Sequence, residues 1–410
     1  MTKKPLLVFL LFLITTAVYS QKPSHPFRIR TITAGVNLGS LVDTTAIVNA
    51  IKFLQKAKQK FTSEGYEVQT LRISTQNLYK YLNQYDHNSA LPFLVKFDQI
   101  AQRNNVILSI GQILPPDKYQ NDIATWAEKL LKTTSAINFS LAISSHDKGI
   151  HFNSIKAAAE IISIISTSNN GENCFRFTAS ANCPAGIPFF PAAFHEGENS
   201  FAIGLESAIL VNEAFKQDNN PSTARQNLKL LLEKNLKPVQ KIAEDISRAE
   251  HMKYGGIDAS PAPGLEASIG QAIETYSGQP FGSPATLSAC ALITDVLKSL
   301  DLKTCGYSGL MLPVIEDKVI AKRAIEGRFS MQELLLYSSV SGTGLDVVPI
   351  PGNTSRQVLE NIMTDVAALS LKYSSKALSV RLFLMPGKNA GDAINFSNPY
   401  LTSSIVMKAY

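Results

Sequence analysis

Short runs rich in β-branched and apolar residues alternate with longer amphipathic stretches along almost the whole chain, and this alternation restricts the fold to the α/β class. The first unit shows the pattern clearly. RIRTITA at 28–34 and VQTLRIS at 68–74 have the composition of strands. Between them, Ile47, Ile51 and Leu54 recur at the spacing of one helical face, which predicts a strand–helix–strand unit.

The same reasoning predicts ten strands in all. They lie at residues 28–34, 68–74, 106–113, 137–144, 174–180, 200–206, 254–260, 306–314, 345–351 and 378–385. Most connections are long enough for right-handed helical crossovers, which join parallel strands. Continuous apolar strands of this kind belong to sheets that are covered on both faces. The sequence therefore predicts either a closed α/β barrel or a large doubly wound sheet.

The first 20 residues have the pattern of a cleavable signal peptide. Lys3 and Lys4 precede an apolar run that ends near Val18, and Ser20 stands at the expected junction. The run is shorter than the roughly 20 residues that a spanning helix needs, although an uncleaved anchor is the alternative. We therefore expect export to the periplasm or the cell exterior, with no membrane contact after cleavage.

The remaining residues, 21–410, show no linker rich in proline, glycine or serine, so we expect one domain. The helical stretch 222–252 contains Pro238, which suits the first turn of a new helix and predicts a break there. Without Lys3 and Lys4 the formal charge falls from +6 to +4, and no basic run is interleaved with aromatic residues. Nucleic acid is therefore not an expected partner.

The cysteine pattern argues against a disulfide framework. Cys174 and Cys183 are the closest pair, and Cys290 and Cys305 complete the set. An oxidising compartment would permit disulfides, but no CxxC metal spacing is present. Free thiols are the simpler expectation.

Polar residues near the strand ends are the candidates for a functional site, because ligands of parallel α/β folds bind at the carboxyl ends of strands. The predicted catalytic residues are His195, Glu206 and Asp258. Two carboxylates and an imidazole suit a divalent cation, and they equally suit general acid–base work. The alternative is structural, with Glu206 and Asp258 capping helices or pairing with arginines inside the fold.

A second set of strand-end residues is predicted to bind ligand. It consists of Arg72, Ser180, Ser260, Ser308, Asn353 and Arg381. Arg72 or Arg381 would hold an anionic group. Asn353 belongs to the run 352–355 that opens a helix, where backbone N–H groups hold anions in other proteins. The same run makes an ordinary helix cap, which is the alternative.

Several familiar catalytic motifs are absent. GYSG at 306–309 lacks the spacing of a nucleophile elbow, and SGTGLD at 341–346 lacks the third glycine of a dinucleotide fingerprint. Gly387 and Lys388 have no upstream glycine at P-loop spacing, and HExxH does not occur. Hydrolase, nucleotide triphosphatase and Rossmann functions therefore lose support.

A series of phrases resembles the bacterial family filed as domain of unknown function 711, also called PFL family proteins. They are RTITAGV (30–36), PFFPAAFHEG (188–197), FAIGLES (201–207), GIDASPAP (256–263), PFGS (280–283), GYSGLMLPVIED (306–317), GTGLDVVPIPG (342–352), DVAAL (365–369) and RLFLMPGKNAGD (381–392). The resemblance implies a fold similar to the pyruvate formate-lyase-like glycyl radical barrel, which has ten strands ringed by helices. It implies no assigned activity.

Radical chemistry does not carry over from that fold. The segment nearest to a glycyl radical loop, 381–385, reads RLFLM and has no glycine to hold a radical. Two further positions depart from the family pattern, with Ser341 where cysteine is common and Asn353 where aspartate is common.

We expect an exported enzyme that acts on a small polar or anionic metabolite at the barrel mouth without a glycyl radical. The alternative is a non-catalytic ligand-binding or degenerate homologue. The sequence leaves a divalent cation and an oligomer possible and names neither.

Overall fold

The structure is a computed structural model that describes residues 24–264, 267–373 and 376–410. The predicted signal peptide, residues 1–20, and the export that it implies lie outside the described residues.

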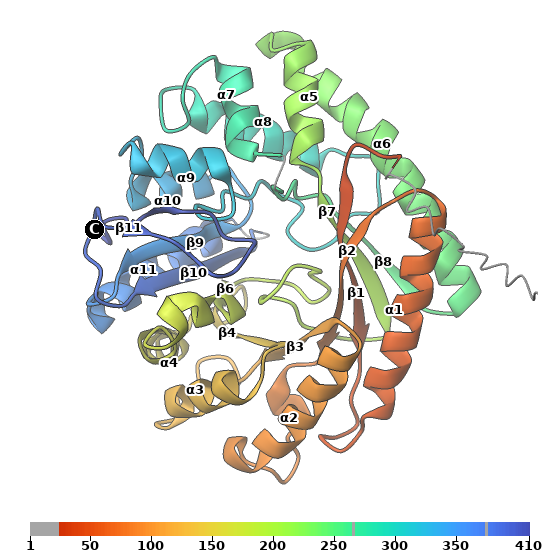
Figure 1. The fold of residues 1–410 in the computed structure, drawn as a ribbon, viewed down its shortest axis with the longest axis vertical. Coiled ribbons are helices and arrows are strands. Elements are labelled where there is room, and N and C mark those ends of the chain that lie inside the picture. Colours follow the sequence, from red (N-terminus) through yellow and green to blue (C-terminus); the bar gives the residue numbers. More distant parts are fainter. Residues whose placement is uncertain (1–23, 265–266, 374–375) are drawn as a thin grey trace, which may run out of the picture.

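A mixed sheet of ten strands forms the centre of the molecule, and helices surround it (Figure 1). The strands are β1 (Arg28–Val36), β2 (Val68–Thr75), β3 (Val106–Gln112), β4 (Ile137–Ser145), β5 (Gly149–Ile150), β6 (Phe177–Ala181), β7 (Ser200–Glu206), β8 (Lys253–Asp258), β9 (Gly344–Pro351) and β10 (Leu378–Met385). Their order is β8-β7-β1-β2-β3-β4-β6-β10-β9, with β5 paired to β4. Two short strands, β11 (Ala393–Ile394) and β12 (Ser404–Ile405), pair separately.

Strand direction reverses at two places in this order. Strands β1, β2, β3, β4 and β6 are parallel to their neighbours in that block. Strand β7 is antiparallel to β1, with Arg28 opposite Glu206, and β10 is antiparallel to β6, with Leu378 opposite Ala181. The carboxyl end of β7 therefore lies beside the amino end of β1.

Nine of the ten predicted strands are present, and the prediction at 306–314 is wrong. Two hydrogen bonds join residues 303–305 to β8, from the Ile257 N–H to the Lys303 carbonyl (2.8 Å) and from the Cys305 N–H to the Ile257 carbonyl. Farther along, the Val314 N–H donates to the Asp346 carbonyl of β9 (3.1 Å). Between these points the chain is irregular because side chains replace strand partners, as described below. The segment 303–314 thus bonds to both outer strands of the sheet order.

The helices pack through apolar faces. They are α1 (Thr45–Ser63), α2 (His87–Arg103), α3 (Ile123–Thr133), α4 (Phe152–Ile165), α5 (Ala208–Gln217), α6 (Pro221–Glu250), α7 (Ile269–Ser277), α8 (Thr286–Lys298), α9 (Lys318–Ile325), α10 (Met331–Ser338) and α11 (Arg356–Lys372), with 3₁₀ turns η1 (Leu78–Lys80) and η2 (Asn169–Arg176). Some pack against the sheet and others, such as α5, α7 and α8, mainly against neighbouring helices. In α1, the predicted face of Ile47, Ile51 and Leu54 is buried.

The predicted break at Pro238 is wrong, because α6 continues through it. Proline removes one backbone N–H from the helix, which costs stability. However, Leu236 and Val239 on either side of it are buried, and so are Ala243 and Ile246 one and two turns later. Burial of this continuous face offsets the lost hydrogen bond.

All four cysteines are free, as expected. Cys174 and Cys290 are buried, and Cys183 and Cys305 are partly exposed. Within residues 24–264, 267–373 and 376–410, no helix is both long enough and apolar enough to cross a membrane.

Candidate functional site

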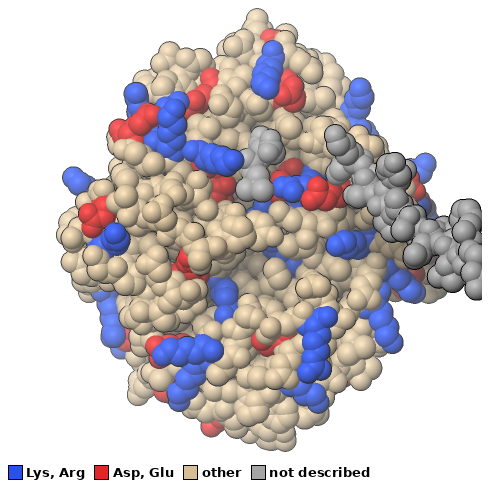
Figure 2. Space-filling model, in the orientation of Figure 1, with Lys and Arg blue, Asp and Glu red and all other residues tan. Residues whose placement is uncertain are grey.

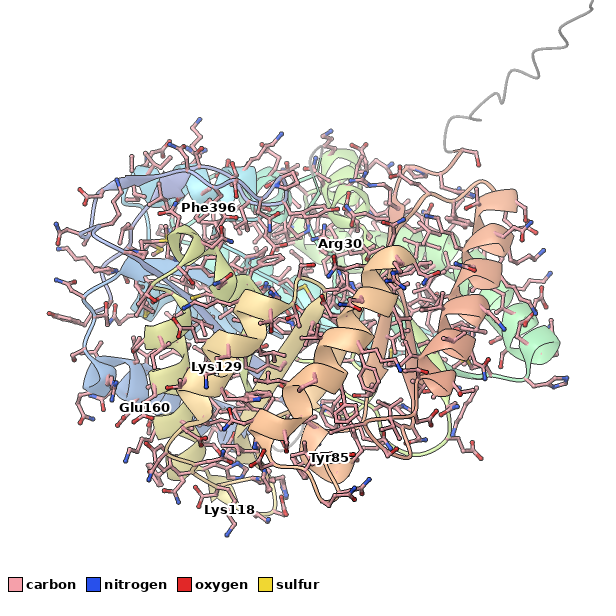
Figure 3. All side chains as sticks on the ribbon, turned by 60° about the horizontal axis from the view of Figure 1, so that its bottom comes forward. Arg30, Tyr85, Lys118, Lys129, Glu160 and Phe396 are labelled. Carbon is pink, nitrogen blue, oxygen red and sulfur yellow. The ribbon has the colours of Figure 1, made fainter. Side chains whose placement is uncertain are left out.

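A cavity of about 360 Å³ lies among the strands, and we call it the arginine cavity. Its charged lining residues are Arg30, Arg72, Glu172, Arg176, Glu316, Asp346 and Arg381. Figure 2 shows a hollow near the middle of one face with Lys or Arg atoms inside it. Arg30 lies among the strands on the same side of the molecule as Phe396, whereas Tyr85 and Lys118 lie on the opposite side (Figure 3).

Inward-turning loops supply the apolar wall of this cavity. A small buried cluster, separate from the main core, consists of Ile187, Phe189, Ala192, Ala262, Tyr307, Met311 and Ala377. Gly309 and Gly342 let two of these loops approach, because a Cβ added to Gly342 would lie 2.4 Å from the Gly309 Cα. The interior is therefore apolar on one side and charged on the other.

A series of alternating acids and arginines, which we call the charge chain, runs from the surface to the charged side of the cavity, where Arg30, Glu316, Arg381 and Asp346 line it. Its members in order are Glu67, Arg28, Glu206, Arg30, Glu316, Arg381 and Asp346.

Distances along the charge chain show direct ion pairs at each step. Arg28 Nε lies 2.9 Å from Glu206 Oε1, and Arg30 Nη1 lies 3.2 Å from Glu206 Oε2. Arg30 Nη2 lies 3.1 Å from Glu316 Oε2. Arg381 Nη1 then lies 3.4 Å from Glu316 Oε1 and 2.9 Å from Asp346 Oδ1. These arginines are thus already neutralised by protein carboxylates.

Arg72 differs from the arginines of the charge chain, because it has no acidic partner among the described residues. The side chain is only 9% exposed, and its Nε donates to Thr70 Oγ1 (3.2 Å). Its guanidinium lies 5.2 Å from the centre of the Phe190 ring. Burial, and then the nearby charge of Arg30, lower the pKa of Arg72 to about 9. The Glu316 charge opposes this shift only in part. A buried cation without a direct ion-pair partner is costly, so this side chain is the strongest mark of an anion site.

Asp346 is the terminal carboxylate of the charge chain. Burial raises its pKa, the Arg381 charge opposes that shift, and the Glu316 charge adds to it. Nearby, the Tyr307 hydroxyl lies 2.6 Å from Ser379 Oγ, and burial raises the pKa of Tyr307 well above its ordinary value. Asp346, Tyr307 and Ser379 all line the arginine cavity.

The structure does not bring the predicted catalytic residues His195, Glu206 and Asp258 together into one group. His195 lines a second cavity of about 220 Å³, and its backbone N–H donates to the Thr75 carbonyl at the carboxyl end of β2. Glu206 belongs to the charge chain at the amino end of β1. Within the described parts of the chain, no three His, Cys, Asp or Glu side chains form a cluster suited to a metal ion. Because β7 runs antiparallel to β1, Glu206 lies at the opposite end of the sheet from His195.

Asp258 has a structural position. Its carboxylate accepts hydrogen bonds from the backbone N–H groups of Tyr307 (2.8 Å) and Ser308 (2.9 Å), and from Ser260 Oγ (2.6 Å). Ser260 Oγ in turn accepts from the Gly309 N–H. The predicted ligand residues Ser260 and Ser308 therefore attach the irregular segment 303–314 to β8, and neither lines the arginine cavity.

Two other predicted ligand residues also lie elsewhere. Ser180 is buried, and its hydroxyl donates to the Leu141 carbonyl. Asn353 lines a separate cavity of about 480 Å³. Next to it, Ser355 is the N-cap of α11 and accepts from the Val358 N–H, which matches the helix-cap alternative.

Arg72 and Arg381 are the predicted ligand residues that the fold brings together, in the arginine cavity. The sequence reasoning did not select Arg30, Glu316 or Asp346 as site residues. A usable signal exists for Arg30, because it lies within a strand run as Arg72 and Arg381 do. An arginine inside a buried strand needs a carboxylate partner, so Arg30 in a strand run predicts buried acids such as Glu316 beside it.

Comparison with known proteins fits the predicted resemblance. The family model described as Uncharacterised ACR (DUF711) matches residues 23–397. The UPF0210 protein of Lactiplantibacillus plantarum is 26% identical over 394 residues, covering 90% of this chain and 88% of that protein. The UPF0210 protein of Pyrobaculum aerophilum is 30% identical over 292 residues, covering 67% of this chain and 62% of that protein. This chain therefore belongs to the DUF711, or UPF0210, family of uncharacterised proteins.

Proposed function

We propose that this protein binds a small organic anion in the arginine cavity, with Arg72 as the anchor for the negative group. The observation that carries the proposal is the Arg72 guanidinium, which is buried at the cavity without an acidic partner among the described residues. Arg381 stands nearby but is already paired with Asp346 and Glu316. An anion on Arg72 would supply the missing counter-charge.

The apolar wall supports a ligand with a non-polar body. Phe189, Phe190 and Met311 line the arginine cavity together with Pro191 and Pro313. A volume of about 360 Å³ is in the range of small-molecule sites. The ligand class that fits is an organic monocarboxylate, with its carboxylate on Arg72 and its body against these side chains.

The test is a binding measurement with benzoate as the probe and inorganic phosphate as the comparison. Calorimetry should detect benzoate binding to the wild type, with phosphate weaker because it has no apolar body. Arg72→Gln should weaken benzoate binding by roughly 10–100-fold, the value of a lost charge-assisted hydrogen bond. The matched control is Arg225→Gln, because Arg225 is exposed and pairs with Asp295 on the surface. Equal benzoate affinity in Arg72→Gln and the wild type would refute the proposal.

Catalysis on the bound anion is a second candidate, supported by Asp346. A largely buried carboxyl with a raised pKa beside a cavity has the character of a general acid or base. His195 and Asp258 lie outside this cavity, so they do not support the role that the sequence suggested for them. Turnover of a carboxylic acid by the wild type, lost in Asp346→Asn, would establish the enzyme.

A closed ten-stranded barrel similar to the pyruvate formate-lyase-like fold is also part of this proposal. The hydrogen bonds from segment 303–314 to β8 and to β9 support closure of the ring. Export through residues 1–20, a single domain over 21–410 and an oligomeric state remain proposals from the sequence.

A further inference from the structure

The arginine cavity has a second polar end, at the start of β4, that the proposed function does not use. Ser135 and Asn138 belong to this part of the chain and line the cavity, and so does Arg176. Arg176 Nε donates to the Ile137 carbonyl (2.8 Å), so its guanidinium lies close to Asn138. A ligand anchored on Arg72 therefore shares the cavity with a further set of polar groups.

The charged side chains of the cavity other than Arg72 are mostly engaged by the protein itself. Arg30 and Arg381 pair with carboxylates of the charge chain. Arg176 donates to backbone carbonyls and to a threonine hydroxyl. Both oxygens of Glu172 accept hydrogen bonds from Ser397. Little of the hydrogen-bonding capacity of these groups is left for a ligand.

Asn138 differs from these side chains, because its amide oxygen has no partner. The residue is 7% exposed, and its Nδ2 donates to the Ala136 carbonyl (3.2 Å), which identifies the other amide atom as the oxygen Oδ1. No described residue donates to Oδ1, although the atom stays accessible. A nearly buried acceptor without a donor is unfavourable, so a ligand that donates to this oxygen gains affinity.

The register of the parallel strands relates Asn138 to Arg72. Arg72 pairs with Ile107 of β3, and Ser109, two residues later, pairs with Asn138 of β4. Alternate residues of a strand share one face, so these side chains all lie on the same face of the sheet. Two strand spacings of about 4.8 Å and a shift of two residues of about 3.3 Å each place the two Cα atoms roughly 12 Å apart. Because both side chains line one cavity of about 360 Å³, a single small ligand can contact both.

A hydroxyl is the ligand group that fits the Asn138 end best. A second carboxylate is ionised at neutral pH and has no hydrogen to donate, so it would leave Oδ1 unpaired. An ammonium group would donate, but the Arg176 charge close to Asn138 repels it. A hydroxyl donates a hydrogen bond without adding a positive charge.

We propose that the ligand of the arginine cavity is a hydroxycarboxylic acid, with its carboxylate on Arg72 and its hydroxyl donating a hydrogen bond to Asn138 Oδ1. This inference rests on the proposed function and specifies the ligand class. Arg72 supplies the affinity for an organic anion, and Asn138 distinguishes hydroxylated acids from acids of the same shape without a hydroxyl.

The first experiment compares ligands that differ in one group. Calorimetry at neutral pH measures the Kd of meta-hydroxybenzoate, para-hydroxybenzoate and para-(hydroxymethyl)benzoate. Each is compared with the acid that has a methyl group in place of the hydroxyl, namely meta-toluate, para-toluate and para-ethylbenzoate.

In at least one of these pairs, the hydroxy acid should bind the wild type about 5- to 20-fold more tightly than its methyl analogue. This range corresponds to one hydrogen bond to an acceptor that is otherwise unpaired. Equal or weaker binding of the hydroxy acid in all of the pairs would overturn the inference.

The second experiment identifies the acceptor. Asn138→Leu keeps a side chain of similar shape but removes the amide oxygen, so the hydroxy acid and its methyl analogue should bind within about twofold of each other. Asn138→Asp keeps an acceptor, so the preference for the hydroxyl should remain, while its charge weakens the binding of both anions. Asn361→Leu, which changes an exposed asparagine of α11, should behave as the wild type.

Two outcomes of this experiment would contradict the assignment. A hydroxyl preference that survives Asn138→Leu and disappears in Asp346→Asn would place the acceptor on Asp346 and overturn the inference. If Asn138→Leu does not fold, Asn138→Asp decides, and loss of the hydroxyl preference in that variant would overturn the inference as well.

The two proposals fail separately. Binding of the benzoates that depends on Arg72 but shows no hydroxyl preference would leave the anion site standing and remove the role of Asn138. Absence of binding for benzoate and all of its derivatives, or binding that ignores Arg72→Gln, would remove both.

Discussion

Replacing Arg72 with methionine is expected to stabilise the protein when no anion has been added. Burial lowers the Arg72 pKa from its ordinary value to about 9, which corresponds to roughly 5 kcal/mol by which the fold disfavours the charged form. Methionine recovers part of this, because it also loses the hydrogen bond to Thr70 and the contact with Phe190. We expect a net gain of about 1–3 kcal/mol in the free energy of unfolding.

Differential scanning calorimetry and urea unfolding can measure this gain. With roughly 2 cal/mol/K of unfolding entropy per residue, 2 kcal/mol raises the Tm of a chain of this length by about 2–3 °C. Benzoate at 100 times the wild-type Kd should narrow this difference, because it adds about 2.7 kcal/mol to the wild type and less to Arg72→Met, which binds it more weakly.

Arg176→Met is the matched control, because Arg176 is a partly buried arginine whose donors are in use. It donates to the carbonyls of Ile137 (2.8 Å), Leu131 (3.2 Å) and Thr134 (2.7 Å). Its loss leaves buried carbonyls without partners and should cost about 3 kcal/mol. If Arg72→Met lost as much stability as Arg176→Met, Arg72 would be a structural residue and the reasoning would be refuted.

Two further outcomes separate the structural residues from the site. Asp258→Asn should lower the free energy of unfolding by about 3 kcal/mol, because an amide cannot accept hydrogen bonds from Tyr307, Ser308 and Ser260 as a carboxylate does. Urea unfolding measures this loss, with Asp295→Asn as the control. A loss below about 1 kcal/mol would contradict the prediction. His195→Ala should leave benzoate affinity within about twofold of the wild type, since His195 lines the other cavity; a tenfold loss by calorimetry would show that the cavities are coupled.

Residue patterns predicted a strand correctly wherever a buried apolar run does adopt strand geometry. The prediction at 306–314 failed because Leu310, Met311 and Leu312 are buried in a loop inside the sheet, and a short apolar run has no periodicity that separates this from a strand. The backbone there is held by the Asp258 carboxylate, a contact made across about 50 residues. A contact between residues so far apart leaves no pattern in the neighbouring sequence from which it could be predicted.

The sequence predicted some residues of the candidate site and missed others, because their proximity also depends on contacts between distant segments. Arg72 and Arg381 were selected as anion ligands, and the fold places both in one cavity. His195 and Glu206 were expected together because the strand-end rule assumes that all strands run in one direction, and they lie at opposite ends of the sheet. Strand direction depends on which edges pair, and neither composition nor spacing determines that.

The two reversals of strand direction also explain why the charge chain exists. Arg28 and Arg30 begin β1, and Glu206 ends β7, so these groups would stand at opposite ends of an all-parallel sheet. The antiparallel pairing of β1 with β7 instead sets Arg28 opposite Glu206. At the other reversal, β10 enters the sheet with Arg381 near its start, within reach of Asp346 at the start of β9. Apart from Glu67, which precedes β2, the acids of the charge chain are therefore supplied by the reversed strands and the segment that follows 303–314. Arg72, in the middle of the parallel block, has no reversed strand beside it, which is why it has no ion-pair partner among the described residues.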